Sequence, residues 1–423
     1  MPLFWVLLLL AAGQMCWSQA IPVTISQQEQ AYTLQRNGEP YFIKGAGGPG
    51  QWDYLVKIGG NSVRTWSVKN AQAVLDSAQA HGLTVMLGLW LQHERHGFDY
   101  SDTAAVARQK ARFTRVVKRF KDHPALLMWG IGNEVDLFYE NEAVWDAVQD
   151  IAALIQRLDP HHPTTTITAG LDPAEVKLIQ EKAPAIDIYG INTYGAIDQV
   201  ATDLKRYGWE GPYLIAEWGP NGHWEVDTLP WGAPLEQTSS AKERDYRQRY
   251  RYIARDSQRC LGSYVFLWGQ KQEVTSTWYG LFTEWGAPTE PLDALQEAWL
   301  GAAPPQPAPS LEALYLNGRP GKDTVLLTQG QRYAAHAEIK PGTRQNLKIE
   351  WRVYPESEAE SEGGDYQPPL KEIKGVVKAL KPGKATLHAA IPPGAYRLFV
   401  YAVDTTGKTA YANLPFRVKK DKP

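Results

Sequence analysis

Short apolar runs alternate with amphipathic segments between residues 41 and 303. Apolar runs of about four to eight residues bounded by turn residues are typical of buried strands, and apolar residues at every third or fourth position are typical of helices. Helical spacing is clearest in residues 70–82, 103–123, 143–160 and 291–301. The strand-like runs are YFIKG (41–45), NSVRTW (61–66), LTVMLGLW (83–90), ALLMWGIGNE (125–134), TTTITAG (164–170), IDIYGINTYG (186–195), YLIAEWG (213–219) and YVFLWG (264–269).

Eight strand and helix units over roughly 260 residues have the size and rhythm of a (β/α)8 TIM barrel, so we predict this α/β fold for residues 21–303. A doubly wound open sheet is the alternative, but it usually carries a Gly-rich phosphate loop. GAGGPG at 45–50 leads into no helix N-terminus with an acidic residue in place, which disfavours nucleotide binding. A hairpin with Asn37-Gly38 at its turn is expected before the first barrel strand.

The pattern changes after residue 303. PPQPAPS at 304–310 is Pro-rich and polar, as expected of a stiff linker. Residues 311–423 show short alternating runs separated by turns such as KPGT and TTGK, without strong helical spacing. We predict a C-terminal immunoglobulin-like β-sandwich for this part, interrupted by an acidic, mobile loop, ESEAESEGGD, at 356–365.

The first 20 residues are expected to be a signal peptide. Their apolar run, Leu3 to Ala12, is too short to span a bilayer, and Ser18-Gln19-Ala20 fits a cleavage site. The segment lacks Lys and Arg, and a lipid anchor at Cys16 is the alternative. Cleavage after Ala20 predicts a secreted or periplasmic protein without stable membrane insertion. Its one remaining cysteine, Cys260, is expected to be a buried, inert thiol.

Composition narrows the possible partners. The 44 Lys and Arg are balanced by 46 Asp and Glu, giving a net charge of −2, so nucleic acid and anionic lipid are not expected partners. The chain also holds 16 Trp. Tryptophan offers an apolar face for a sugar ring and a polar N–H at its edge, so several of them are candidate sugar platforms as well as core residues. Trp90, at the end of the third run, is the one we expect to contact sugar.

Reactive side chains gather at the ends of the predicted strands, where TIM barrels keep their active sites. The fourth run ends in Asn133-Glu134 and the seventh in Glu217, while Arg64 interrupts the second and the sixth carries Asn192 and Tyr194. Two carboxylates that converge at a barrel mouth suit the cleavage of a glycosidic bond, because one can donate a proton while the other attacks the anomeric carbon. An arginine beside the second carboxylate would favour its ionised form.

Four motifs resemble those of clan A glycoside hydrolases. HPALLMWGIGNE is similar to the fourth-strand motif that ends in Asn-Glu, and YLIAEWG to the seventh-strand motif. GGNSVRTW resembles the second-strand motif with its arginine. YFIKGAGG resembles the start of the barrel in family 2 enzymes and in fungal β-1,3-glucanosyltransferases. The resemblance covers residues 30–300 or so, and the two glutamate motifs are its most specific part.

The resemblance implies a role for each residue. Glu134 would be the acid/base and Glu217 the nucleophile of a retaining mechanism. Arg64, Asn133 and Tyr194 would surround them, and Trp268 would be the sugar platform of the eighth strand. No metal or organic cofactor is implied, since two carboxylates suffice for this chemistry.

These observations predict an exported retaining β-glycosidase that acts on a β-glucan-like poly- or oligosaccharide. STWYGLF at 276–282 resembles the glucanosyltransferases and favours a β-1,3-glucan. A β-glucan transglycosylase using the same site is one alternative, and a non-catalytic carbohydrate-binding surface protein is another. Linkage, endo or exo action and oligomeric state do not follow from the sequence.

Some reactive residues are expected to stay outside the chemistry. Glu284 lies in a second EWG triplet, but it follows the last predicted strand, so we expect a rim or structural role. His93 and His96 lack metal-ligand spacing and are expected in a loop, as a subsite contact or as plain surface. His161 and His162 precede the fifth strand and should lie at the opposite, structural end of the barrel.

Overall fold

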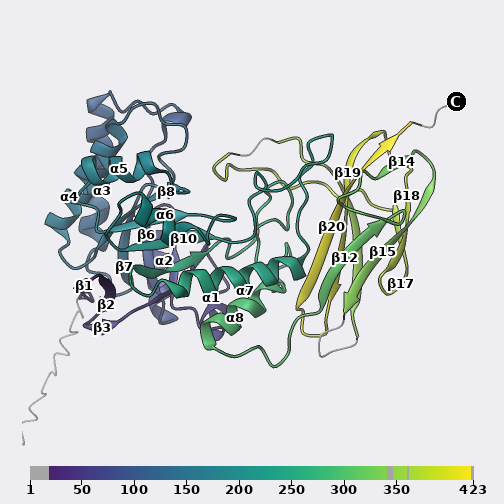
Figure 1. The fold of residues 1–423 in the computed structure, drawn as a ribbon, viewed down its shortest axis with the longest axis horizontal. Helices are drawn as coiled ribbons and strands as arrows, with labels where there is room; N and C mark the ends of the chain where they lie inside the picture. Colours follow the sequence, from purple (N-terminus) through teal and green to yellow (C-terminus); the bar gives the residue numbers. More distant parts are fainter. Residues whose placement is uncertain (1–18, 341–345, 360–361, 421–423) are drawn as a thin grey trace, which may run out of the picture.

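The computed structural model describes residues 19–340, 346–359 and 362–420. Figure 1 shows a helix-wrapped barrel, purple to green, beside a strand-rich C-terminal part, green to yellow. The predicted signal peptide lies outside the described residues except for its last two positions. Within the described chain, no helix is both long and apolar enough to cross a membrane.

Eight parallel strands close into a barrel in the order in which the sequence predicts them. The ring closes where the last strand pairs with the first, with Gly262 opposite Ile43. This confirms the predicted TIM barrel. The strands are β4 (Ile43–Gly47), β5 (Ser62–Arg64), β6 (Thr84–Leu89), β7 (Leu126–Ile131), β8 (Thr164–Ala169), β9 (Ile188–Asn192), β10 (Tyr213–Trp218) and β11 (Cys260–Val265).

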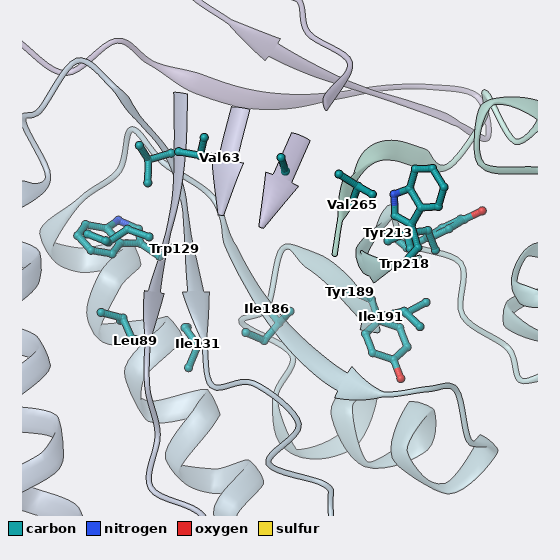
Figure 2. Packing of buried hydrophobic residues seen from close by; sticks show 14 of the residues in the cluster. Val63, Leu89, Trp129, Ile131, Ile186, Tyr189, Ile191, Tyr213, Trp218 and Val265 are labelled. Carbon is teal, nitrogen blue, oxygen red and sulfur yellow. The ribbon is translucent and has the colours of Figure 1, made fainter. Parts of the chain in front are cut away.

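The helices cover the outside of the barrel with their apolar faces. Trp129 and Trp218 point outward from their strands into this layer, and Tyr189 and Ile191 lie in the same cluster (Figure 2). Asp102 caps the longest helix by accepting hydrogen bonds from the N–H groups of Ala104 and Ala105. The helices are α1 (Trp52–Lys57), α2 (Ala71–Ala80), α3 (Thr103–Phe120), α4 (Ala143–Leu158), α5 (Pro173–Lys182), α6 (Val200–Arg206), α7 (Ser239–Arg255) and α8 (Pro291–Leu300), with a 3-10 turn at Glu94–His96.

A three-stranded meander closes the N-terminal end of the barrel. It consists of β1 (Val23–Gln28), β2 (Ala31–Arg36) and β3 (Glu39–Pro40), and the turn residues Asn37 and Gly38 have φ values of 55° and 80°. Two positive φ angles are what a tight Asn-Gly hairpin turn requires. Apolar side chains of this meander share one buried cluster with those that fill the barrel, so the barrel is a packed core and its chemistry is confined to the other end.

The last barrel strand begins four residues earlier than its apolar run. YVFLWG (264–269) was predicted to form this strand, but β11 spans Cys260–Val265. The first side chain beyond the strand is therefore Phe266, and Trp268 lies further along the following loop. This shift changes which aromatic residue reaches the barrel mouth.

The C-terminal part consists of two sheets around a shared apolar core. One has five strands in the order β13-β12-β15-β18-β17, and the other has four in the order β14-β20-β19-β16. The strands are β12 (Ser310–Leu316), β13 (Arg319–Pro320), β14 (Leu326–Thr328), β15 (Arg332–Lys340), β16 (Lys348–Pro355), β17 (Val377–Lys381), β18 (Lys384–His388), β19 (Gly394–Val403) and β20 (Thr409–Lys419).

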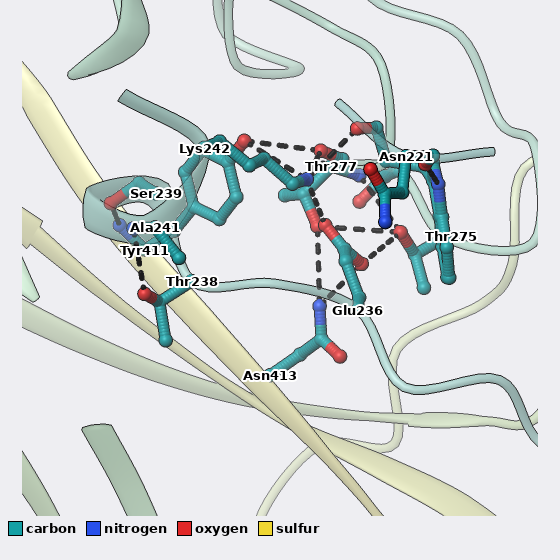
Figure 3. Close-up of polar contacts among 12 residues, drawn as sticks. Asn221, Glu236, Thr238, Ser239, Ala241, Lys242, Thr275, Thr277, Tyr411 and Asn413 are labelled. Carbon is teal, nitrogen blue, oxygen red and sulfur yellow. Dashed lines mark hydrogen bonds and ion pairs between the residues drawn. The ribbon is translucent and has the colours of Figure 1, made fainter. Parts of the chain in front are cut away.

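A buried ionic network joins the barrel to β20 (Figure 3). Lys242 and Glu236 form an ion pair at 2.6 Å, with 2% and 0% of their side chains exposed. The Lys242 ammonium also donates to the carbonyl oxygens of Thr277 and Trp278, both at 2.8 Å, while Asn413 of β20 donates to Glu236. A buried ion pair is tolerated when each charge has such further partners. The network fixes the backbone just before Tyr279, a residue of the candidate site.

Candidate active site

A cavity of about 260 Å³ opens at the carboxyl ends of the barrel strands. TIM-barrel enzymes keep their active sites at this end. Most of the predicted site residues meet here, together with several aromatic residues that were not predicted. The lining residues are Trp66, Trp90, Asn133, Glu134, Tyr194, Glu217, Trp224, Phe266, Leu267, Lys271, Glu273, Tyr279, Gly363 and Gly364.

Three donors converge on the carboxylate of Glu217. Its Oε1 accepts hydrogen bonds from Arg64 Nη1 at 3.0 Å and from Trp66 Nε1 at 2.6 Å. Its Oε2 accepts from the Tyr194 hydroxyl at 3.0 Å. These donors hold the carboxylate in one orientation. Because Arg64 is 1% exposed, its charge faces this carboxylate in a place from which solvent is excluded.

An asparagine pair connects the two glutamates. Arg64 donates to the side-chain oxygens of Asn133, at 2.6 Å, and Asn192, at 3.1 Å. The Asn192 amide in turn donates to Glu134 Oε1 at 2.8 Å. A single network of hydrogen bonds thus runs from Glu217 through the arginine to Glu134, which places both carboxyl groups in one rigid arrangement.

Glu134 lies in a different environment from Glu217. It follows β7 with a φ of 52°, a conformation that is uncommon for a residue other than glycine and that occurs often at functional sites. Burial, reinforced by the negative charge of Glu217, raises the pKa of its carboxyl to about 7. Glu134 therefore holds a proton over much of the neutral range, as a general acid must.

Aromatic side chains form the walls of the cavity. Trp90 lines it as predicted and stacks on His93, with ring centroids 4.9 Å apart. The eighth-strand platform was assigned to the wrong residue. Trp268 is fully buried, packs against Phe282 and donates its N–H to the Gly50 carbonyl, so it does not reach the cavity. Because β11 ends at Val265, Phe266 occupies the wall instead.

Some lining residues could have been found from the sequence and others could not. Trp66 stands two residues after Arg64, so strand alternation puts both on one side, and this signal was available. Asn192 ends β9, as its place in the sixth run indicates, and it contacts Glu134 without lining this cavity. Tyr279 and Trp224 lie in long loops without periodicity, and Gly363 comes from the C-terminal part of the chain.

The residues expected to stay outside the chemistry lie away from the cavity, with one exception. Glu284 faces Arg352 of β16 at 3.4 Å, and His162 contacts the buried Asp159 at 2.9 Å. Burial raises the pKa of the Cys260 thiol to about 12, which keeps it unreactive. The exception is His93, which lies buried behind Trp90. Among the residues with described positions, no cluster of three His, Cys, Asp or Glu side chains has the geometry of a metal site.

Trp66→Phe tests the hydrogen bond to Glu217. Phenylalanine keeps an aromatic ring beside Phe266 but loses the N–H donor at 2.6 Å. Hydrogen bonds to charged groups contribute about 1.5–3 kcal/mol, so we expect kcat to fall by about 10- to 100-fold. Steady-state kinetics on an aryl β-glycoside measures this. Trp285→Phe, outside the cavity lining, is the matched control, and equal losses in both variants would contradict a specific role for Trp66.

Comparison with known proteins agrees with the barrel fold. Residues 51–222 match the family described as "Glycosyl hydrolases family 2, TIM barrel domain". The β-glucuronidase of Sus scrofa is 24% identical over 246 residues, which are 49% of this chain and 35% of that protein. The β-glucuronidase of Paenibacillus borealis is 24% identical over 307 residues, covering 62% of this chain and 50% of that one.

Solved structures show the same architecture. The Bacteroides uniformis β-glucuronidase aligns with 94% of this chain and 48% of its own, with a TM-score of 0.51 and 12% identity. The Faecalibacterium prausnitzii β-glucuronidase aligns with 66% of this chain and 52% of its own, with a TM-score of 0.51 and 19% identity. At these identities the likeness shows the fold alone. The chain spans between about a quarter and a half of the length of the relatives it matches.

Proposed function

We propose that the protein is a retaining β-glycosidase related to glycosyl hydrolase family 2, whose TIM-barrel model matches residues 51–222. One observation carries the proposal: two glutamates meet in one cavity in opposite electrostatic environments. Glu217 accepts hydrogen bonds from an arginine, a tryptophan and a tyrosine, whereas burial raises the pKa of Glu134 to about 7. This difference in environment assigns Glu217 as the nucleophile and Glu134 as the proton donor.

The first step forms a glycosyl-enzyme. A carboxylate oxygen of Glu217 attacks the anomeric carbon, and the bond from that carbon to the leaving oxygen breaks. Glu134 gives its proton to this oxygen as the bond electrons move onto it. Arg64 and Trp66 stay on Glu217 Oε1, and Tyr194 stays on Oε2, so the nucleophile enters the reaction already oriented.

The second step reverses these roles. Glu134, now ionised, takes a proton from a water molecule whose oxygen attacks the anomeric carbon, and the bond to Glu217 breaks. Two displacements at one carbon restore the β configuration. In retaining enzymes the two carboxyl groups stand about 5–5.5 Å apart, which is the separation that this mechanism predicts here.

The charges around the cavity favour a neutral sugar over a uronic acid, although the relatives above carry the name β-glucuronidase. The cavity is lined by three acidic side chains, Glu134, Glu217 and Glu273. Its lysine, Lys271, is held by Glu273 at 2.7 Å and by the Gly364 carbonyl at 2.9 Å. Arg64 is held by Glu217. Both cations are thus paired with protein groups, so neither is free to bind a substrate carboxylate. A neutral, β-glucan-like substrate fits this arrangement of charges.

A panel of aryl glycosides tests the substrate class. We expect kcat/KM on an aryl β-glucoside or β-galactoside to exceed that on the matching β-glucuronide by about 100-fold or more, because a substrate carboxylate would lie unpaired among acidic groups. β-1,3-, β-1,4-, β-1,6- and mixed-linkage glucans with product sizing extend the panel. A preference for the glucuronide would overturn the neutral-sugar assignment while leaving the glycosidase intact.

Transglycosylation is the second candidate function, because a further cavity of about 510 Å³ adjoins the first. The two share Glu134 and Tyr194, and the second one is bordered by Phe138 and Trp224, which are 59% and 61% exposed. Aromatic faces of this kind can hold a sugar acceptor against the glycosyl-enzyme. Products longer than the substrate would show transfer.

Two further proposals concern the ends of the chain. We infer export through residues 1–20, and sequencing the N-terminus of secreted protein tests this, with Ile21 as the expected first residue. The immunoglobulin-like class of the C-terminal part is supported by its two facing sheets of mostly antiparallel strands. An experimental structure compared with immunoglobulin domains decides that assignment.

A further inference from the structure

A short turn of the C-terminal part, Glu362–Asp365, lies in the wall of the barrel cavity. It belongs to the segment between β16 and β17. Gly363 and Gly364 line the first cavity, and Glu362 and Gly363 line the second. This acidic segment was predicted to be a mobile loop of the sandwich, but in the described residues it contacts the candidate active site.

Charged contacts hold the turn on two different barrel loops. Arg95, in the loop after β6, donates to both carboxylate oxygens of Asp365, at 2.9 and 3.0 Å, and His96 Nε2 lies 3.5 Å from the same group. Lys271, in the loop after β11, donates to the Gly364 carbonyl at 2.9 Å. The turn thus bridges loops that follow strands three positions apart in the ring, and its paired arginine contact is a strong, directional one.

The glycines let the turn pack this closely. Gly363 and Gly364 have φ values of 54° and 72°. A Cβ atom on Gly363 would lie 2.7 Å from Leu137 Cδ2 and 2.9 Å from Arg95 Nη2. The positive φ angles therefore favour glycine at both positions, and a side chain on Gly363 would displace Leu137 and Arg95 from the turn. The two glycines bring bare main chain to the boundary between the two cavities.

A second anchor fixes the chain just beyond the turn. Gln367 is 2% exposed, and its side-chain oxygen accepts a hydrogen bond from the Val274 N–H at 2.8 Å. Its amide donates to the Ala359 carbonyl at 3.2 Å, across the base of the loop. The turn is therefore held from both sides, by Gln367 at its base and by Asp365 at its tip.

We propose that the Glu362–Asp365 turn is a specificity-determining element that selects a neutral saccharide as the leaving group. This rests on the proposed glycosidase function. The second cavity lies on the side of Glu134, the proton donor to the leaving oxygen, and Glu217 does not line it. Glu362 adds its carboxylate to those of Asp203 and Glu225 there, against one histidine, His223. An acidic leaving group is disfavoured by these charges, while a neutral sugar can stack on Trp224.

Asp365→Ala, which releases the tip of the turn, tests this inference with two substrates. One is a neutral β-linked oligosaccharide, whose leaving group fills the second cavity. The other is a β-glycosyl fluoride, whose leaving atom leaves that cavity empty. We expect kcat/KM to fall about tenfold on the oligosaccharide and less than threefold on the fluoride. Glu358→Ala, an exposed change in the same loop, should match the parent.

Two further variants sharpen the test. The exchange Arg95→Asp with Asp365→Arg should recover part of the loss on the oligosaccharide, and Glu362→Lys should raise kcat/KM on an oligosaccharide with a uronic acid in its leaving group. Equal losses on both substrates, or no loss on either, would overturn the inference.

Binding separates this inference from the proposed function. Oligosaccharide titrations followed by tryptophan fluorescence compare Glu217→Gln with the double variant Glu217→Gln/Asp365→Ala. Weaker binding in the double variant supports the turn even if the parent hydrolyses neither substrate, an outcome that would refute the proposed function alone. Unchanged binding would refute the inference, and melting temperatures show whether each variant is folded.

Discussion

Glu217→Gln is expected to lower kcat on every β-glycoside substrate by about 10⁴-fold or more, because the glycosyl-enzyme can no longer form. Glutamine keeps the shape of the side chain and can still accept hydrogen bonds from Arg64 and Trp66, so the cavity should keep its form. Substrate binding should therefore survive. Single-turnover kinetics measures the loss, and calorimetric titration with an oligosaccharide measures the binding.

The control for this change is Glu284→Gln. Glu284 stands in an identical Glu-Trp-Gly triplet, but it faces Arg352 beside the C-terminal sheets and lies outside the cavity lining. Its replacement should leave kcat within about twofold, since single surface ion pairs contribute little. A parent enzyme that binds oligosaccharide without hydrolysing any member of the panel would favour the carbohydrate-binding alternative. Retained turnover in Glu217→Gln would refute the nucleophile assignment.

Glu134→Ala should affect substrates according to their leaving groups. Loss of general acid catalysis costs about 10²–10⁴-fold, but an activated leaving group such as dinitrophenolate departs without a proton. We therefore expect a large loss of kcat/KM on an oligosaccharide and a small one on the dinitrophenyl glycoside. Added azide should speed the second step and give a β-glycosyl azide, because it attacks the glycosyl-enzyme without needing a base. An equal loss on both substrates would argue against this role.

The pH profile gives an independent readout of Glu134. Its carboxyl must be protonated in the first step, and burial raises its pKa to about 7. As the pH rises through 7 the proton is lost, so kcat/KM on a poor leaving group should fall on the basic side. This fall of kcat/KM on the basic side should be absent in Glu134→Ala. Burial raises the pKa of a neighbouring carboxyl, Asp136, to about 8. If Glu134 causes the fall of kcat/KM on the basic side, Asp136→Asn should still show it.

The barrel and its two glutamates were predictable because both follow from local patterns. Each barrel strand is a short run buried on both faces, which leaves a continuous apolar signature, and β/α alternation allows few other arrangements. Glu134 comes three residues after β7, and Glu217 is the last but one residue of β10. Once the strands are parallel in a ring, the positions after them meet at one end, so the convergence required no knowledge of loops.

The Trp268 assignment failed because an apolar run does not mark where a strand stops. Cys260 to Trp268 is continuously apolar or small, and pairing with β4 ends at Val265. An error of three residues at this point exchanged a residue of the barrel mouth, Phe266, for a residue of the core. Boundaries depend on which backbone groups find partners in the neighbouring strand, and a single run carries no such information.

The contribution of residues 362–365 to the site could not be predicted from the sequence, for a different reason. Arg95 and Asp365 are 270 positions apart, and each stands in a polar loop. Loops lack the periodicity that marks strands and helices, so nothing local pairs them. The acidic, Gly-containing segment has the composition of a free loop, and only its contact with the barrel makes it part of the site.

The buried pair of Lys242 and Glu236 limits which parts of this protein can be exchanged with other proteins by recombination. The proline-rich stretch at 304–310 is the obvious place for recombination to join a barrel to a new partner, yet Asn413 and the Tyr411 hydroxyl lie on the far side of it and complete the shell around the pair. A barrel joined at residues 304–310 to an unrelated domain would keep the buried charges of Lys242 and Glu236. It would lose Asn413 and the Tyr411 hydroxyl, which form hydrogen bonds with them. The unit that can be exchanged intact is therefore the barrel together with β20.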